Sequence, residues 1–251
     1  MDFIGIIPAR YQSVRFVGKP LVDLAGKSMI VRTYEQACKV KQFVNVVVAT
    51  DDKRIYEEIV SSGGKAIMTA NTHVSGTDRC AEALTLLNCE QKNTVVVNIQ
   101  GDEPFIQPQQ IEELIACFDN PNTKIATIIK KIETEEILHN PNIVKVVVSD
   151  TGKALYFSRC AIPFLRNSYF EDVNFYKHIG IYAYKAEVLN EIVKIPSSSL
   201  EKAELLEQLR WLQAGYEIQT VKTKYEDTIG IDTKEDVEKA LLYYSTYNKT
   251  P

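Results

Sequence analysis

Three cationic side chains follow the first apolar stretch of the chain. Arg10, Arg15 and Lys19 lie on a loop that also contains Gly18 and comes directly after the apolar residues 3–7. Arginine binds phosphate oxygens with two parallel N–H groups, lysine adds a point charge, and glycine lets a ligand approach the backbone. The loop therefore predicts a phosphate site, although its composition alone is equally compatible with a solvated basic loop.

This loop has neither of two common phosphate-binding motifs. A Walker A loop needs a second glycine at a fixed spacing and a Ser or Thr after the lysine, but Pro20 follows Lys19 here. The GxGxxG pattern of dinucleotide-binding folds is also absent. If the loop binds a nucleotide, it does so by another arrangement.

Carboxylates follow a second apolar run and could hold a metal ion. Asp102 and Glu103 come directly after residues 94–99. A carboxylate at a strand end is a common Mg²⁺ ligand, because this metal keeps several waters and bridges phosphates. Cations for phosphate oxygens together with carboxylates for Mg²⁺ predict a site for a nucleoside triphosphate. The simpler interpretation of the same residues is a surface turn between Gly101 and Pro104.

One carboxylate rarely holds Mg²⁺ well, so a second ligand is expected elsewhere. The best candidate is Asp232, in the segment 230–236. That segment also resembles a helix start, with Thr233 followed three residues later by Asp236. Asp232 is then either a metal ligand or only the residue before the helix cap.

Apolar runs alternate with amphipathic stretches through the first half of the chain. The predicted strands are residues 3–7, 44–49, 65–68, 94–99 and 124–129, and the predicted helices are 28–41, 52–62, 77–90 and 107–119. Several strands are apolar on both faces, which is typical of a parallel sheet covered on both sides. The sequence therefore predicts an α/β fold with a doubly wound, mostly parallel sheet. Ligands of such sheets bind beyond the carboxyl ends of the strands, where both motifs fall.

After residue 142 the pattern becomes rich in strands. We expect a hairpin of residues 143–149 and 154–159, a loop at 161–177, an extended piece at 178–184, a helix at 201–213, a strand at 217–222 and a helix at 233–244. No repeat or linker is evident. We therefore predict a single domain, residues 1–251, with a β-rich insertion at about 143–200.

Two polar groups in this second half are candidates for binding a hydroxyl-rich ligand. Alternation along residues 178–184 predicts one polar and aromatic face. That face contains His178, Gly180, Tyr182 and Tyr184. In the helix that follows, Glu207 and Gln208 lie off the stripe of leucines. Both groups also have simpler interpretations, because a strand histidine is usually structural and polar helix residues usually face water.

Composition excludes several classes of protein. The 251 residues are 45% hydrophobic and 25% charged, which is ordinary for a globular chain. A net charge of −4 argues against nucleic acid as a partner. The five scattered cysteines are typical of reduced thiols in a cytoplasm. Neither a signal peptide nor an apolar run of membrane-spanning length is expected, so we predict no membrane partner.

Several motifs of this chain, in the same order, resemble those of 3-deoxy-manno-octulosonate (Kdo) cytidylyltransferases. They are Pro8-Ala9-Arg10-Tyr11 with the loop to Leu21, His73–Arg79, Gln100–Pro104, Leu155–Arg159, Lys177–Tyr182, Leu206–Arg210 and Gly230–Asp236. Val17 departs from the family, which usually has proline before the glycine. This difference removes no phosphate ligand.

The resemblance implies roles for individual residues. For the nucleotide they are Ala9, Arg10, Arg15, Lys19, Ser75, Gly76, Arg79 and Gln100. Asp102 and Asp232 would hold Mg²⁺, the implied cofactor. Arg10, Lys19 and Asp102 would be catalytic. The sugar acid would contact Arg159, through its carboxylate, and also His178, Tyr182, Glu207 and Gln208.

The resemblance also implies the reaction: CTP and Kdo give CMP-Kdo and pyrophosphate, for lipopolysaccharide biosynthesis in the cytoplasm. Because the β-rich region is similar to the dimerisation region of the family, we expect a homodimer. Two alternatives stay open. One is a cytidylyltransferase for a related acid, such as 8-amino Kdo or a sialic acid. The other is a non-catalytic nucleotide or sugar sensor on the same fold, although a sensor need not retain metal ligands.

Overall fold

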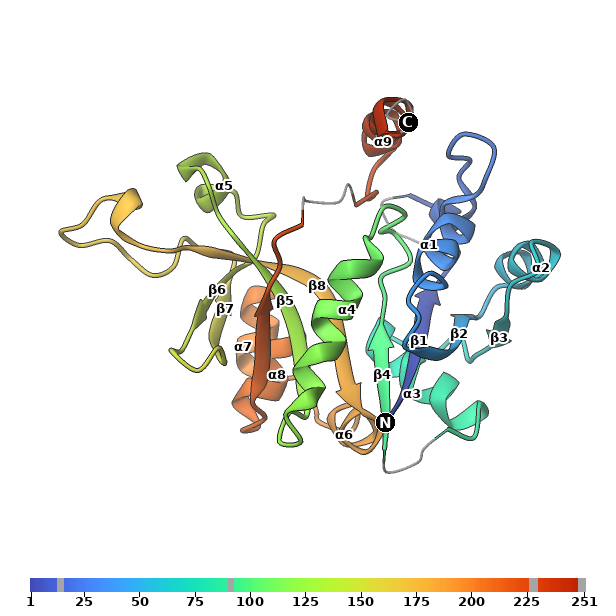
Figure 1. Cartoon of the computed structure of the whole chain (residues 1–251), viewed down its shortest axis with the longest axis horizontal. Coiled ribbons are helices and arrows are strands. Elements are labelled where there is room, and N and C mark those ends of the chain that lie inside the picture. The colour runs from blue at the N-terminus through green and yellow to red at the C-terminus, as the bar shows by residue number, and fades with distance from the viewer. Residues whose placement is uncertain (13–15, 90–92, 226–229, 248–251) are drawn as a thin grey trace. The chain divides into compact units, whose positions relative to one another are not determined.

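The computed structural model describes residues 1–12, 16–89, 93–225 and 230–247. The chain forms two compact units, one of residues 1–112 and 225–251 and the other of residues 113–224 (Figure 1). Unit 1 therefore takes its parts from both ends of the chain. Both units combine strands with helices, which confirms the predicted α/β class. The predictions of a single domain and of an insertion at about 143–200 stay predictions.

Unit 1 is built on four parallel strands. The central strand β1 (Asp2–Ala9) pairs with β2 (Phe43–Thr50) on one side and β4 (Thr94–Asn98) on the other. Strand β3 (Ala66–Met68) extends the sheet beyond β2. All five residues of β4 are buried. A strand buried on both faces needs helices on both sides of the sheet, as the apolar runs predicted.

The helices of unit 1 are capped in part by polar side chains. They are the 3₁₀ turn η1 (Lys19–Leu21), α1 (Met29–Ala37), α2 (Lys53–Ser61), α3 (Gly76–Leu86), α4 (Pro108–Ala116), which runs on into unit 2, and α9 (Lys234–Tyr247). Asp52 caps α2, and Ser75 forms a capping box with Asp78 at α3. These caps fix where each helix begins and therefore where the preceding loops lie.

The C-terminal helix α9 is attached to the beginning of unit 1. Ile231 and Ala240 are fully buried in a cluster with Leu24 and Met29, and α9 is the dark red helix in Figure 1. A cation–π contact adds to this packing: the guanidinium of Arg32 lies 4.2 Å from the centre of the Tyr244 ring. The segment that carries Asp232 is thus held by the apolar packing of Ile231 directly before it and of Ala240 after it.

Unit 2 contains the remaining strands, with mixed directions. Strand β5 (Ile125–Lys131) is parallel to β9 (Ile218–Lys222) and antiparallel to β8 (Tyr176–Lys185). Strands β6 (Lys145–Val148) and β7 (Ala154–Ser158) form the predicted hairpin. A register shift in the pairing of β5 with β8 falls beside Gly180 and Ile181, next to the predicted ligand-binding face.

The predicted helix 201–213 is wrong as a single element. The structure has α7 (Ser199–Glu204) and α8 (Gln208–Gln213), separated by Leu205 with a left-handed φ of 54°. The reason is a tertiary contact: the carboxylate of Glu204 accepts hydrogen bonds from Ser158 and from the backbone of Arg159. A helix period cannot show such a break, because it arises from a strand elsewhere in the sequence.

The sequence also missed some short elements of unit 2. They are α5 (Glu135–His139), α6 (Ala186–Ile192) and the 3₁₀ turn η3 (Phe170–Asp172), the last within the segment predicted as a loop. None exceeds seven residues, which is too short for a clear helical period. The end of the predicted helix 107–119 is the 3₁₀ turn η2 (Cys117–Asp119).

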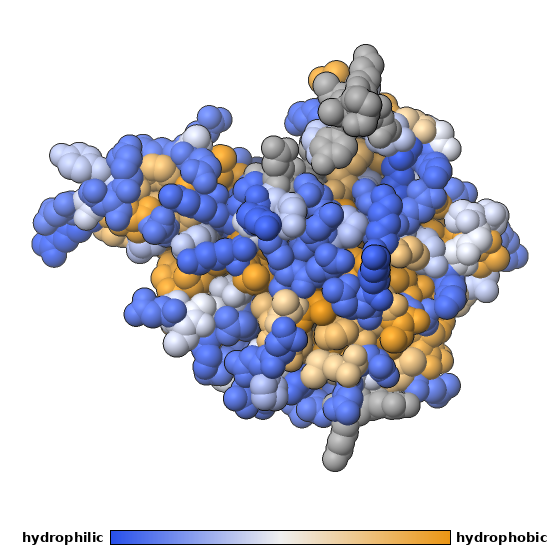
Figure 2. Space-filling model, viewed as in Figure 1, coloured by the Kyte–Doolittle hydropathy of each residue, from blue (hydrophilic) through white to orange (hydrophobic). Residues whose placement is uncertain are grey.

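The surface carries both polar and apolar residues. Figure 2 shows hydrophilic residues interspersed with hydrophobic ones on one face of the molecule. Among the described residues, no helix combines the length and the apolar character needed to cross a membrane.

Candidate active site

A pocket of about 230 Å³ opens in unit 1 beside the ends of β1 and β4. It is lined by Pro8, Ala9, Arg10, Lys19, Pro20, Met29, His73, Val74, Ser75, Gly76, Arg79, Gln100, Gly101, Asp102 and Asp232. Every predicted nucleotide or metal residue that the structure describes is among them. Arg15 lies outside the described residues. The pocket is where a doubly wound sheet is expected to bind its ligand.

Gly18, near the end of the basic loop, is a glycine that no other residue could replace easily. Gly18 has a φ of 76°, and a Cβ there would lie 3.1 Å from the ring of Tyr11. Its N–H donates to the Tyr11 carbonyl at 2.9 Å. Lys19, the next residue, lines the pocket. Val17, which stands where the resembling family has proline, is 57% exposed, so the difference falls at the surface.

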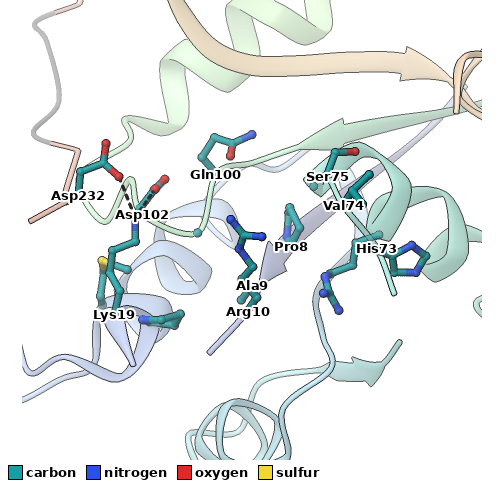
Figure 3. Close-up of a pocket in the computed structure, with 15 residues that line it drawn as sticks. Pro8, Ala9, Arg10, Lys19, His73, Val74, Ser75, Gln100, Asp102 and Asp232 are labelled. Atoms are coloured by element: carbon teal, nitrogen blue, oxygen red, sulfur yellow. Dashed lines mark hydrogen bonds and ion pairs between the residues drawn. The ribbon is translucent and has the colours of Figure 1, made fainter. Parts of the chain in front are cut away.

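The ammonium of Lys19 joins the two predicted metal ligands. Its Nζ lies 2.7 Å from Oδ2 of Asp102 and 3.1 Å from Oδ1 of Asp232 (Figure 3). Two carboxylates that approach one cation this closely can also approach another. They are 130 positions apart in the sequence, and only the family resemblance indicated that they would meet.

Hydrogen bonds of the backbone hold the two segments that carry these carboxylates. The backbone N–H of Ile231 donates to the Asp102 carbonyl at 3.0 Å. On the other side of Asp232, the carboxylate of Asp236 accepts from the N–H groups of Asp232 and Thr233. The two interpretations of Asp232 are therefore compatible, because it precedes a helix cap and also lines the pocket.

The donor set fits Mg²⁺ in its usual nucleotide-bound form. No group of three or more His, Cys, Asp or Glu side chains suited to a metal occurs in the described part of the chain. Mg²⁺ is commonly held by one or two carboxylates, with waters and substrate phosphates as the other ligands. Asp102 and Asp232 are such a pair, beside a pocket with cations for the phosphates.

The exposed guanidinium of Arg10 stands between the two walls of the pocket. Figure 3 shows it between the Lys19–Asp102–Asp232 group and the residues Ser75 and His73. Arg10 makes no hydrogen bond or ion pair with the residues that the structure describes. Its donors are thus available to a phosphate.

The wall of the pocket opposite Lys19 is the beginning of helix α3 (Figure 3). A Cβ on Gly76 would lie 3.1 Å from the Pro8 side chain, so glycine lets the helix approach the end of β1. Ser75 accepts from the N–H of Asp78 at 3.1 Å. The first N–H groups of a helix and its dipole favour a negatively charged ligand. On the acidic turn, the side chain of Gln100 donates weakly to Asn98, at 3.5 Å.

Arg79 is held by the protein itself. It is 4% exposed, and its Nη1 donates to Oγ1 of Thr69 at 2.6 Å and to the Ala70 carbonyl at 3.3 Å. Its Nη2 lies 3.4 Å from Asp51. Arg79 therefore lines the pocket mainly as a support for the loop 69–70.

His73 also lines the pocket, although the sequence predicts no nucleotide role for it. Its Nε2 is paired with the carboxylate of Glu82 on α3. Burial would raise the pKa of Glu82, but the bonds from His73 and from the Ala70 N–H outweigh this effect and lower the pKa. The sequence held one clue, because His73 begins the motif that supplies Ser75 and Gly76.

In unit 2, Arg159 uses part of its guanidinium to bind backbone carbonyls. Its Nε donates to the Glu204 carbonyl at 2.9 Å and its Nη1 to the Pro141 carbonyl at 3.2 Å. Nη2 makes no hydrogen bond to the described residues. The sequence did not identify Glu204 or Pro141 as partners, since neither belongs to a motif.

His178 is neutral, and its hydrogen bonds define its tautomer. Burial lowers its pKa to about 3. Its Nε2 lies 2.9 Å from Oγ1 of Thr127, and that hydroxyl lies 2.7 Å from the Ile181 carbonyl. Since a carbonyl can only accept, the hydroxyl donates to it and accepts from Nε2–H. Nδ1 is left as an acceptor that suits a sugar hydroxyl.

The other predicted sugar-binding residues lie near His178 or on α8. The ring of Tyr182, which is 7% exposed, lies 5.2 Å from those of His178 and Trp211. Glu207 accepts from Arg210 at 2.8 Å. Gln208 is 5% exposed, so the alternative that it faces water is wrong. Alternation correctly placed His178 and Tyr182 on one face.

The depressed pKa of His178 predicts how stability depends on pH. The unfolded chain binds a proton at this residue near pH 6.5, whereas the folded protein does so only near its folded pKa of about 3. The free energy of unfolding should therefore fall as the pH is lowered from about 6.5 towards 3. In thermal denaturation at several pH values, His178→Gln should weaken this dependence. His139→Gln, which replaces an exposed histidine of the same unit, should not; equal profiles for both variants would contradict the assignment.

Comparison with known proteins agrees with this geometry. The family model that matches is described as cytidylyltransferase and covers residues 4–222. A solved structure of CMP:2-keto-3-deoxy-manno-octonic acid synthetase complexed with CTP matches with a TM-score of 0.92 and 42% identity, covering 98% of this chain and 100% of that one. The fold and the pocket thus define a nucleotidyltransferase of the cytidylyltransferase class.

Curated relatives narrow the class. The 3-deoxy-manno-octulosonate cytidylyltransferase of Parabacteroides distasonis is 52% identical over 251 residues, which cover 97% of this chain and 98% of the relative. The enzyme of the same name from Bacteroides thetaiotaomicron is 52% identical over 96% of this chain and 97% of its own length. The chain belongs to the 3-deoxy-manno-octulosonate cytidylyltransferase family.

Proposed function

We propose that this protein transfers CMP from CTP to the anomeric 2-hydroxyl of Kdo and releases pyrophosphate, with Mg²⁺ as cofactor. The observation that carries the proposal is the pocket in which Asp102 and Asp232 approach one cation beside Arg10 and Ser75. A triphosphate needs such a combination of cations and metal-binding carboxylates. The family of the chain indicates cytosine as the base and Kdo as the acid.

The bond changes of the transfer are simple. The hydroxyl oxygen of the sugar acid forms a bond to the α-phosphorus of CTP, and the bond from that phosphorus to the bridging oxygen breaks. Pyrophosphate leaves with the electron pair, and the hydroxyl proton passes to solvent. Arg10 and Lys19 offset the charge that develops on the phosphate oxygens. Bound Mg²⁺ would add Lewis-acid polarisation and lower the pKa of a coordinated hydroxyl.

The residues of unit 2 supply groups suited to a sugar acid. The unused Nη2 of Arg159 can bind a carboxylate. The acceptor Nδ1 of His178 and the polar side chains of Tyr182, Glu207 and Gln208 can bind hydroxyls. Since no histidine or carboxylate of the pocket is free of a strong partner and placed as a base, we assign the protein mainly a positioning and charge-stabilising role.

Pyrophosphate release tests the function. With CTP and Mg²⁺, release should require Kdo and should be slower with 8-amino Kdo, with a sialic acid or with UTP. Faster release with one of the other acids would replace Kdo as the substrate. Binding of CTP without release with any acid would support the sensor alternative and overturn the proposal.

Replacing Arg159 tests the sugar-acid side separately. A guanidinium–carboxylate pair contributes about 1.5–3 kcal/mol, so Arg159→Ala should raise the KM for Kdo by about ten- to a hundred-fold. The KM for CTP should change much less. Arg166→Ala removes an exposed arginine of the same unit and serves as the control. An equal loss for both substrates would mean that Arg159 has a structural role.

The remaining assignments concern the setting of the reaction. We place the enzyme in the cytoplasm, in lipopolysaccharide biosynthesis, as a homodimer. Apolar side chains exposed in unit 2 support the dimer: Leu155, Phe164, Tyr169 and Leu205 are 58%, 86%, 79% and 77% exposed. Sedimentation at several protein concentrations tests this assignment, and a monomer at all of them would contradict it.

A further inference from the structure

A lysine of strand β6 is completely buried. Lys145 is 0% exposed, and its Nζ donates to three backbone carbonyls, those of Asn140 at 2.8 Å, Ile143 at 2.7 Å and Arg159 at 2.5 Å. It makes no ion pair with a carboxylate of the described residues. Burying an ammonium is costly unless its donors are all used. The three carbonyls use them all.

Because its three N–H groups are occupied, Lys145 has none left for a substrate. Any role in the reaction must therefore pass through the groups that it holds. One of those groups is the carbonyl of Arg159. The other two bracket Pro141, in the segment 140–143.

Pro141 is itself a partner of Arg159. Its carbonyl accepts from Nη1 of Arg159 at 3.2 Å. Lys145 thus holds the backbone of Arg159 and also the segment that receives one end of its guanidinium. Glu204 completes the arrangement, since its carboxylate accepts from the Arg159 N–H and its carbonyl accepts from Nε.

We propose that Lys145 is a positioning residue for the sugar acid: its buried ammonium fixes Arg159 and the segment 140–143 so that Nη2 of Arg159 is presented to the carboxylate of the substrate. The inference rests on the proposed role of Arg159. It assigns a function to a buried charge that the nucleotide pocket does not use.

The test is Lys145→Met, which keeps much of the volume and removes the charge and the donors. It should raise the KM for Kdo by about ten-fold, because a displaced binding group loses much of its effect. The KM for CTP should stay unchanged, since the predicted CTP residues lie in unit 1. Lys185→Met is the matched control. It removes an ammonium that donates to the Pro121 carbonyl of the same unit at 2.6 Å, and it should alter neither KM.

A double variant separates positioning from general damage. If Lys145 acts through Arg159, adding Lys145→Met to Arg159→Ala should raise the KM for Kdo no further. A full additional increase, or equal effects on both substrates, would overturn the inference. If the methionine variant does not fold, the same two KM values are measured for Lys145→Gln. Glutamine keeps two N–H donors. An unchanged KM for Kdo in Arg159→Ala would instead refute the role of Arg159, and Lys145→Met would then have no positioning effect to show.

Discussion

Replacing Asp102 by asparagine is expected to lower CMP transfer by about a thousand-fold. The change removes a charged ligand from the proposed Mg²⁺ site, and the loss of about 4 kcal/mol of charge stabilisation corresponds to that factor. Asp232→Asn should have a similar effect, because both carboxylates lie within 3.1 Å of the same ammonium. Steady-state rates at several Mg²⁺ concentrations measure the effect.

Calorimetry and a control variant distinguish metal binding from other causes of a low rate. Calorimetry of CTP binding should show that Mg²⁺ strengthens binding in the unaltered protein and not in the two variants. Glu103→Gln is the control, since Glu103 is on the same turn as Asp102 and does not line the pocket. Near-normal rates for either aspartate variant at moderate Mg²⁺ would remove that residue from the metal site.

Lys19→Met should lower kcat by about a hundred-fold while the Kd for CTP changes much less. An ammonium that follows charge onto the phosphates stabilises the transition state more than the bound substrate, and such an effect is seen in kcat. Arg10 and the metal would still hold the triphosphate. The structure adds an expectation of its own: without the ammonium between Asp102 and Asp232, Mg²⁺ should bind to the variant at lower concentrations.

The two parts of this prediction are checked by kinetics and by titration. Lys27→Met is a suitable control, because it removes another lysine of unit 1 that pairs with a carboxylate, Glu35, at 2.6 Å. An unchanged kcat with a weakened Kd for CTP would show that Lys19 only anchors the ground state.

Local patterns were sufficient to predict most of unit 1. Runs such as residues 94–99 are apolar on both faces, and amphipathic stretches such as 52–62 alternate with them, so the strand and helix positions follow from neighbouring residues. The strand ends then indicated where Arg10 and Asp102 would lie. Asp232 was different: no spacing relates it to Asp102, and its assignment depended on resemblance to a family.

Unit 2 was predicted less completely, because the arrangement of its predicted sugar-acid residues depends on contacts between distant segments. Alternation placed His178 and Tyr182 on one face. It could not show that Thr127, on another strand, would set the tautomer of His178. Likewise, Glu204, one partner of Arg159, is the last residue of helix α7, which stops against its expected period. Lys145 was hidden in an ordinary apolar strand.

The backbone bond between Ile231 and Asp102 has a consequence for how the enzyme is made. Residues 1–112 leave the ribosome before the whole of unit 2, and the segment with Asp232 follows only afterwards. A nascent chain can therefore form β1 to β4, with Arg10, Lys19 and Asp102, long before it has the second carboxylate. The proposed metal site is therefore completed last during synthesis, and we expect a growing or prematurely terminated chain that lacks this segment to be unable to consume CTP.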